Sequence, residues 1–323
     1  MKLFILKTIL FIIPIITLSI IVYKLVPKKE LDTQNYLGAI IDKHERLSTI
    51  KSPCIILAGG SNLAFGINSE LIEKELKIPI VNLGLHGGLG LEFMLGELKS
   101  SIKERDTVYL STEYWLSIKG DERLKRLASK LFPESKDYYP TNFTQNLSME
   151  IDETRMLILG NESNEMPNAI QPSNDTIFMD IYSRKAFNSY GDEIAHLNQR
   201  SSFKSNQKKI HYSKWHGIEL INEFYEFAKQ KNVSVYFLFP CFPKSEYNLN
   251  KQAIDRLVND IENELNVPVV NNSYDFIYED SLFFDTQYHL NKSGRELRTQ
   301  KLISIIKKHK RTTKNLINKE LND

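Results

Sequence analysis

The sequence predicts an α/β fold: a doubly wound, flavodoxin-like parallel sheet of five strands, held between two layers of helices in a three-layer α/β/α arrangement. Short, continuous apolar runs such as residues 54–57 and 233–239 are typical of strands that are buried on both faces of a sheet. Segments with helical periodicity alternate with these runs, which indicates parallel strands joined by crossover helices. We also expect a long insertion after the third strand and an amino-terminal transmembrane helix.

The amino terminus carries the apolar segment, residues 3–26, whose uncharged core runs from Thr8 to Tyr23. Lys7 and Lys24 flank this core at the spacing of the two bilayer interfaces. The apolar run ends without the small residues of a cleavage site, so we predict an uncleaved signal anchor over residues 1–27. Flanking lysines do not decide the orientation, but long domains translocate largely regardless of them. We therefore predict a single-pass protein of the cell membrane with its large domain outside the cytoplasm.

The remaining elements follow in chain order. Polar residues 28–52 predict a stalk, and residues 53–310 predict the α/β domain, followed by a polar tail over residues 311–323. An Asn- and Ser-rich stretch of weak periodicity, about residues 117–212, predicts an insertion that caps the site. Strands are predicted at 54–57, 78–83, 106–114, 233–239 and 267–270, and helices at 70–76, 91–102, 214–231, 251–265 and 293–308, with shorter helical pieces at 124–131 and 177–187.

Composition excludes several functions. The 42 Lys and Arg residues nearly balance the 40 Asp and Glu residues, and no basic run is interleaved with aromatics, so we predict no nucleic-acid partner. The two cysteines, Cys54 and Cys241, lack metal-ligand spacing. His211 and His216 have no third ligand spaced for zinc. No metal or other cofactor is therefore predicted.

The first candidate site residue is Ser61, in Gly59-Gly60-Ser61-Asn62 at the end of the first predicted strand. Ligands bind beyond the carboxyl ends of strands in open α/β sheets, so Ser61 lies where a nucleophile would lie. Taken alone, these four residues favour a simple turn over a nucleophile site. The carboxyl-terminal part of the chain favours the first interpretation, because it supplies the partners that a serine nucleophile needs.

These partners are Asp285 and His289, which lie after the last predicted strand. A serine attacks only when a base takes its proton, and a third group must orient that base. His289 is the candidate base and Asp285 the candidate orienting group. The backbone N–H groups of Ser61 and of a glycine in residues 84–90 are candidates for stabilising an oxyanion. His86, in the same glycine loop, is more often a loop histidine than a catalyst.

The pattern resembles the SGNH (GDSL-like) hydrolase superfamily over about residues 53–310, the insertion excepted. Gly-Gly-Ser61-Asn62 is similar to its first motif, Asn82-Leu-Gly-Leu-His-Gly87 to its second, and the stretch from Asp285 to His289 to its last. The resemblance implies an acyl-serine mechanism with Gly87 as an oxyanion donor, and Asn62 as a neighbour of the site. Membrane-anchored chains of this plan resemble the extracytoplasmic proteins that work beside membrane-bound O-acyltransferases. This implies a membrane-bound O-acyltransferase as partner and a cell-envelope glycan as substrate.

Two features depart from that pattern. The third motif of the superfamily offers an asparagine as oxyanion donor, whereas the matching position here is Glu113, and an ionised carboxylate cannot donate. Asp285 and His289 are four residues apart rather than three. The sequence therefore leaves two functions open: an acyltransferase or esterase acting on envelope polysaccharide, and a non-catalytic module that binds glycan or organises an envelope assembly.

Overall fold

The computed structural model describes residues 32–140 and 181–320, together with isolated positions among residues 4–21 and residue 151; side chains are described up to residue 309. The described residues from Thr33 to Tyr139 and from 181 onward belong to one compact unit. None of the helices in these ranges has the length and apolar character needed to cross a bilayer. The predicted span, residues 3–26, lies largely outside the described residues.

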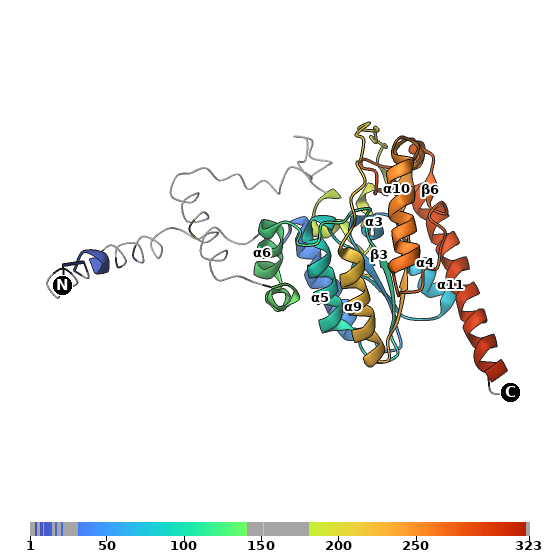
Figure 1. The fold of residues 1–323 in the computed structure, drawn as a ribbon, viewed down its shortest axis with the longest axis horizontal. Coiled ribbons are helices and arrows are strands. Elements are labelled where there is room, and N and C mark those ends of the chain that lie inside the picture. The colour runs from blue at the N-terminus through green and yellow to red at the C-terminus, as the bar shows by residue number, and fades with distance from the viewer. Residues whose placement is uncertain are drawn as a thin grey trace. The chain divides into compact units, whose positions relative to one another are not determined.

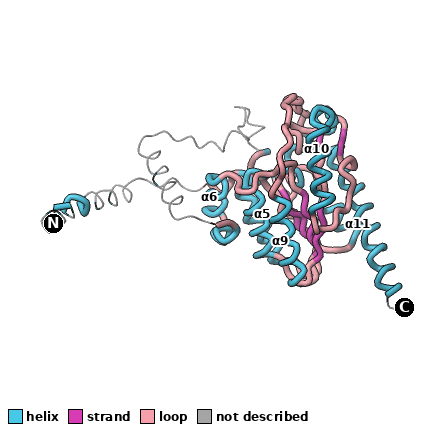
Figure 2. Tube along the Cα trace, viewed as in Figure 1, coloured by secondary structure: helices cyan, strands magenta, loops and turns pink. Residues whose placement is uncertain are grey.

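A four-stranded parallel sheet forms the centre of the unit, in the order β2-β1-β3-β4. The strands are β1 (Ile55–Gly59), β2 (Ile80–Asn82), β3 (Thr107–Ser111) and β4 (Ser234–Phe237). Figure 2 shows them in magenta among the helices. All five residues of β1 are buried, as expected for a central strand covered on both faces. The α/β fold with a parallel sheet is thus confirmed.

The prediction of a fifth strand at residues 267–270 is wrong. This segment runs beside β4 but makes only a single parallel bridge, between Phe237 and Val269. Pro268 has no N–H to donate, so the ladder cannot continue through it. One step further on, the side chain of Asn271, rather than a backbone carbonyl, accepts from the N–H of Phe239. A separate pair of short parallel strands, β5 (Phe242–Pro243) and β6 (Ile277–Tyr278), was not predicted.

Helices cover both faces of the sheet (Figure 1). On one face α5 (Gly90–Ser101), α9 (Gly217–Gln230) and α10 (Lys244–Glu264) share a core with alternate strand residues, and α5 packs against α9. On the other face α4 (Ser69–Leu76) packs against α11 (Lys292–Glu320). The Asn68 side chain caps α4 by accepting from the N–H of Leu71, at 3.1 Å. Helix α11 includes most of the segment that we expected to be a polar tail.

Part of the predicted stalk is folded onto the sheet. Residues 36–38 form the 3₁₀ helix η1 (Tyr36–Gly38), and α2 (Ala39–Thr49) follows it directly. Lys43 of α2 is fully buried, and its ammonium donates to the carbonyls of Asn82, Gly84 and Gly191. This one side chain therefore fastens the glycine loop after β2. Within the predicted stalk, residues 39–49 are thus helical, and one face of this helix is buried.

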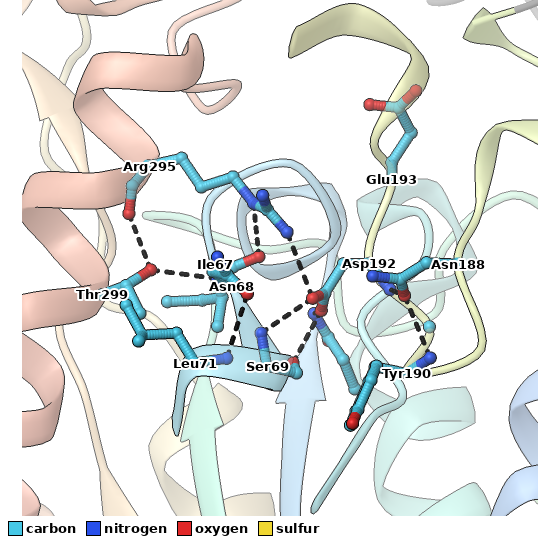
Figure 3. A network of polar contacts seen from close by, with 12 residues as sticks. Ile67, Asn68, Ser69, Leu71, Asn188, Tyr190, Asp192, Glu193, Arg295 and Thr299 are labelled. Atoms are coloured by element: carbon cyan, nitrogen blue, oxygen red, sulfur yellow. Dashed lines mark hydrogen bonds and ion pairs between the residues drawn. The ribbon is translucent and has the colours of Figure 1, made fainter. Parts of the chain in front are cut away.

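The described parts of the predicted insertion also pack on the domain. They contain the helix α6 (Glu122–Leu131) and three short 3₁₀ helices: η3 (Pro133–Tyr138), η5 (Arg184–Ala186) and η6 (Ala195–Asn198). Another 3₁₀ helix, η2 (Gly87–Leu89), comes before the insertion in the chain. The buried carboxylate of Asp192 accepts from the N–H and hydroxyl of Ser69, from Asn82 and from Arg295 (Figure 3). This network joins the insertion to α4, β2 and α11. The remaining 3₁₀ helix, η7 (Asp280–Leu282), precedes α11.

The contacts of Lys43 yield the first prediction. In Lys43→Met three buried carbonyls lose their donor, so the free energy of unfolding should fall by about 2–4 kcal/mol. The measurement is the urea midpoint of the detergent-solubilised chain. The exposed residue Lys51 supplies the control, because Lys51→Met makes the same substitution without leaving a buried acceptor. Equal midpoints for the two variants would contradict this role of Lys43.

Candidate active site

Ser61 lies where β1 ends, at the first position of the short helix α3 (Ser61–Ala64). The chain turns tightly there because two glycines precede it. A Cβ on Gly59 would come within 2.0 Å of the carbonyl oxygen of Ser111, and one on Gly60 within 2.2 Å of the Glu113 carboxyl. Ser61 itself is partly exposed. Among the described residues, no hydrogen bond engages its hydroxyl, which leaves that oxygen open to a reactant.

Asp285 and His289 are in contact, with 2.8 Å between Asp285 Oδ1 and His289 Nδ1. Their loop is closed by an antiparallel bridge between Phe283 and Leu290, and the N–H of Phe284 donates to the carbonyl of His289. The pair therefore forms across a closed loop and not along a helical turn, so the four-residue spacing is compatible with an orienting contact. His289 is only 6% exposed.

A tyrosine of the insertion completes this pair. The Tyr182 hydroxyl donates to Asp285 Oδ2 and lies 3.4 Å from His289 Nδ1. Burial acts to raise the pKa of Asp285, but His289 and the Tyr182 hydroxyl outweigh it and hold that pKa below its usual range. Asp285 is therefore an ionised carboxylate at neutral pH, as an orienting group for a histidine base must be.

Phe65 connects the Asp285–His289 pair to the serine. Its ring stacks on the His289 imidazole, with 3.8 Å between ring centroids and 6° between the planes. Phe65 follows Ser61 by one helical turn, and its N–H donates to the Ser61 carbonyl. His289 thus lies against the turn that carries Ser61. Through Phe65, the turn that carries Ser61 and the loop that carries His289 are therefore in contact.

Glu113 lies between the two glycine loops. Its Oε1 accepts from the backbone N–H and from the side-chain amide of Asn62, both at 3.2 Å. Its carboxyl is also 3.4 Å from where a Cβ on Gly87 would stand. The same side chain therefore borders Gly60 and Gly87, the second of which is the predicted oxyanion glycine. Burial raises the pKa of Glu113, against the opposing effect of its hydrogen bonds and of His289.

Asn62 is held from behind by a buried cation. Arg298 of α11 donates to the backbone carbonyl of Asn62 at 2.6 Å and to its side-chain oxygen at 3.0 Å. The Asn62 amide in turn donates to the Ser111 carbonyl at 3.0 Å. Asn62, predicted as a neighbour of the site, therefore links Arg298 to Glu113 and fixes the turn after β1.

The other histidines that were weighed from the sequence make no hydrogen bond to Ser61, Asp285 or His289 within the described residues. His86 Nδ1 accepts from the N–H of Gly88 and caps η2, and burial lowers the pKa of His86 to about 4. It is thus a neutral loop residue at neutral pH. His211 and His216 are exposed. No group of three His, Cys, Asp or Glu residues in the described ranges could hold a metal ion.

Three residues of the site were missed in the sequence: Tyr182, Phe65 and Arg298. Tyr182 belongs to no motif, and its position in a polar insertion carries no signal. Phe65 could have been found from the sequence, because it lies four residues after Ser61 and residues at this spacing share a helix face. Arg298 lies at position i−4 from the buried Leu302, which places it on the inner face of α11.

In comparisons with known proteins, no family model and no curated protein matches this chain. The class that can be stated is therefore that of the fold: an α/β protein with a four-stranded parallel sheet. The serine after one central strand shares a helical turn with Phe65, whose ring stacks on the histidine of a contacting Asp–His pair. Within the described residues, no hydrogen bond joins that histidine to the serine. This arrangement can activate a hydroxyl nucleophile, and that chemistry guides the prediction that follows.

The contact of Tyr182 with Asp285 can be tested by the reactivity of the serine. Tyr182→Phe removes one of the hydrogen bonds that hold Asp285, so the rate of labelling by a fluorophosphonate, which reacts with activated serines, should fall about tenfold. Tyr212→Phe is a matched control, because it removes a Tyr–Asp hydrogen bond of 2.6 Å to Asp260 on α10. An unchanged labelling rate in Tyr182→Phe would show that Asp285 is oriented without the hydroxyl.

Proposed function

We propose that this chain is a membrane-anchored, extracytoplasmic acyltransferase or esterase of the SGNH type, which transfers a small acyl group such as acetyl to or from a cell-envelope polysaccharide. The observation that carries the proposal is the Asp285–His289 pair stacked, through Phe65, on the helical turn of Ser61. Ser61 follows a strand of the parallel sheet, where ligands bind in open α/β folds, and the contacting Asp–His pair supplies the two other kinds of residue that serine catalysis requires.

The roles follow from the contacts. Because Nδ1 of His289 faces the Asp285 carboxylate, Nδ1 carries the proton and Nε2 is the basic nitrogen. Nε2 takes the proton of Ser61 as Oγ attacks the acyl carbonyl, and the imidazolium then returns that proton to the departing alcohol. Asp285 stabilises the imidazolium in between. Water or a glycan hydroxyl, deprotonated by His289, then attacks the acyl-serine, and the imidazolium returns that proton to Ser61 Oγ as the acyl–oxygen bond breaks.

The strand order supports the flavodoxin-like plan of this proposal. The segment with Val269 lies beyond β4, on the side away from β3, so its bridge occupies the place of a fifth strand. The apolar residues 3–26 and the resemblance to partners of membrane-bound O-acyltransferases support a place at the membrane. A membrane-bound acyl donor and a glycan acceptor are the partners we propose.

Glu113 favours a second candidate, a non-catalytic module that binds glycan or organises an envelope assembly. An ionised carboxylate beside Gly60 and Gly87 would repel the oxyanion of an acyl-transfer reaction. The two candidates differ in one measurable property, the reactivity of Ser61.

Labelling of the full chain by a fluorophosphonate tests the proposal directly. Wild type should be labelled and Ser61→Ala should not be. His289→Ala should lose nearly as much reactivity, and the double variant little more, because residues of a triad act as a unit. Ser48→Ala, at an exposed serine near the end of α2, is the matched control and should react like wild type. A wild-type chain that reacts no better than Ser61→Ala would favour the non-catalytic module.

The proposed tether gives a further prediction. The folded unit begins at Thr33, only a few residues after the predicted span, so the site would stay close to the bilayer. Such a tether raises the effective concentration of a membrane-bound acyl donor but not of a soluble one. With residues 1–27 replaced by a cleavable export signal, glycan acylation in cells should fall strongly, while turnover of a small soluble ester should stay unchanged.

The two activities in that experiment separate the alternatives. Equal loss of both would show that the span is needed for folding. Full retention of both would show that the acyl donor is soluble, and the partnership with a membrane-bound O-acyltransferase would be wrong.

A further inference from the structure

The carboxyl of Glu113 occupies the space that borders both glycine loops of the site. A Cβ added to Gly60 would meet Glu113 Oε1 at 2.2 Å and Oε2 at 2.5 Å, and one added to Gly87 would meet Oε2 at 3.4 Å. Gly60 precedes Ser61 directly. The Glu113 carboxyl therefore lies beside the residue that directly precedes the candidate nucleophile and beside the candidate oxyanion glycine.

The two oxygens of Glu113 differ in their surroundings. Oε1 accepts two hydrogen bonds, from the backbone N–H and the side-chain amide of Asn62. Oε2 is buried and has no hydrogen-bond partner among the described residues. This is the asymmetry of a neutral carboxylic acid, in which the carbonyl oxygen accepts and the hydroxyl oxygen carries a proton. An ionised carboxylate would leave a buried anionic oxygen without a donor, which is costly.

The charges around Glu113 act in both directions. Burial favours the neutral acid, whereas the backbone N–H of Glu113 itself, the side-chain amide and backbone N–H of Asn62 and, when protonated, His289 favour the anion; the pKa of Glu113 is raised on balance. Arg298 is separated from the carboxyl by Asn62, to which it donates. Three further described groups interact electrostatically with Glu113 and are neutral at neutral pH, because burial raises their pKa values: Tyr36, Tyr288 and Cys241.

Building on the acyl transfer proposed above, we propose that Glu113 is a catalytic residue that acts as a neutral acid. Its Oε2–H donates a hydrogen bond to the acyl oxygen of the substrate as negative charge develops there. The proton stays on Oε2 throughout, so no bond to it is broken. The side chain thus supplies the donor that the superfamily takes from an asparagine amide, and Asn62 and Arg298 hold it in place.

Glu113→Gln tests this role, because its amide keeps an acceptor toward Asn62 and places a donor at the position of Oε2. We expect its rate of fluorophosphonate labelling to stay within about threefold of wild type at neutral pH, whereas Glu113→Ala should lose about 10²- to 10³-fold. The pH profile is the decisive readout. The wild-type rate should fall as pH rises through the raised pKa of Glu113, because ionisation removes the donor, and the Gln variant should lack that fall.

Two results would overturn the role of Glu113 while leaving the proposed function intact: a Gln variant as slow as the Ala variant, or the same alkaline fall in Gln as in wild type. A wild-type chain that does not react at all would overturn both proposals. Infrared difference spectroscopy supplies a readout independent of reactivity. The carbonyl band of a protonated acid should be present in wild type at neutral pH and absent in Glu113→Gln, and its absence from wild type would also overturn the proposal.

Discussion

The buried guanidinium of Arg298 is the interaction on which the geometry of the site depends. It is 1% exposed, and the groups it contacts are the oxygens of Asn62, the Ser111 hydroxyl, the Cys241 sulfur and the ring of Phe276. An arginine stays charged, and burying that charge is expensive unless acceptors surround it. The backbone turn after β1 therefore has to present its oxygens to α11. Asn62 is fixed as a result, and with it the donors that face Glu113.

Much of the site's precision comes from packing rather than from hydrogen bonds. His289 is oriented by Asp285 on one edge, but its plane is set by the ring of Phe65, which is fully buried. Phe65 in turn belongs to the helical turn that begins at Ser61. The Phe65 ring therefore packs on the histidine, and the Phe65 backbone belongs to the turn of the serine. Aromatic stacking of this kind adds little energy by itself but leaves few alternative orientations.

The sheet and its helices were predictable because burial on both faces leaves a clear apolar run in each strand. Ser61, Asp285 and His289 stay predictions as catalytic residues; the sequence indicated them because strand ends of a parallel sheet converge. Residues 267–270 were wrongly predicted as a strand because the prediction rested on their apolar character alone. Pro268 lacks the N–H group that the hydrogen-bond ladder of a strand requires. Tyr182 and Arg298 were not predicted because their partners, Asp285 and Asn62, lie 103 and 236 residues away in the sequence. A single sequence does not show which distant residues are in contact.

The contact of Lys43 with the glycine loop after β2 determines where this chain can be shortened. Its ammonium satisfies the carbonyls of Asn82 and Gly84, and Tyr36, three residues after Thr33, donates its hydroxyl to the carbonyl of Leu85. A fragment cut at the start of β1 would contain every predicted catalytic side chain yet lose both anchors of the loop that carries Gly87. A soluble fragment intended for crystallisation must therefore begin before Thr33.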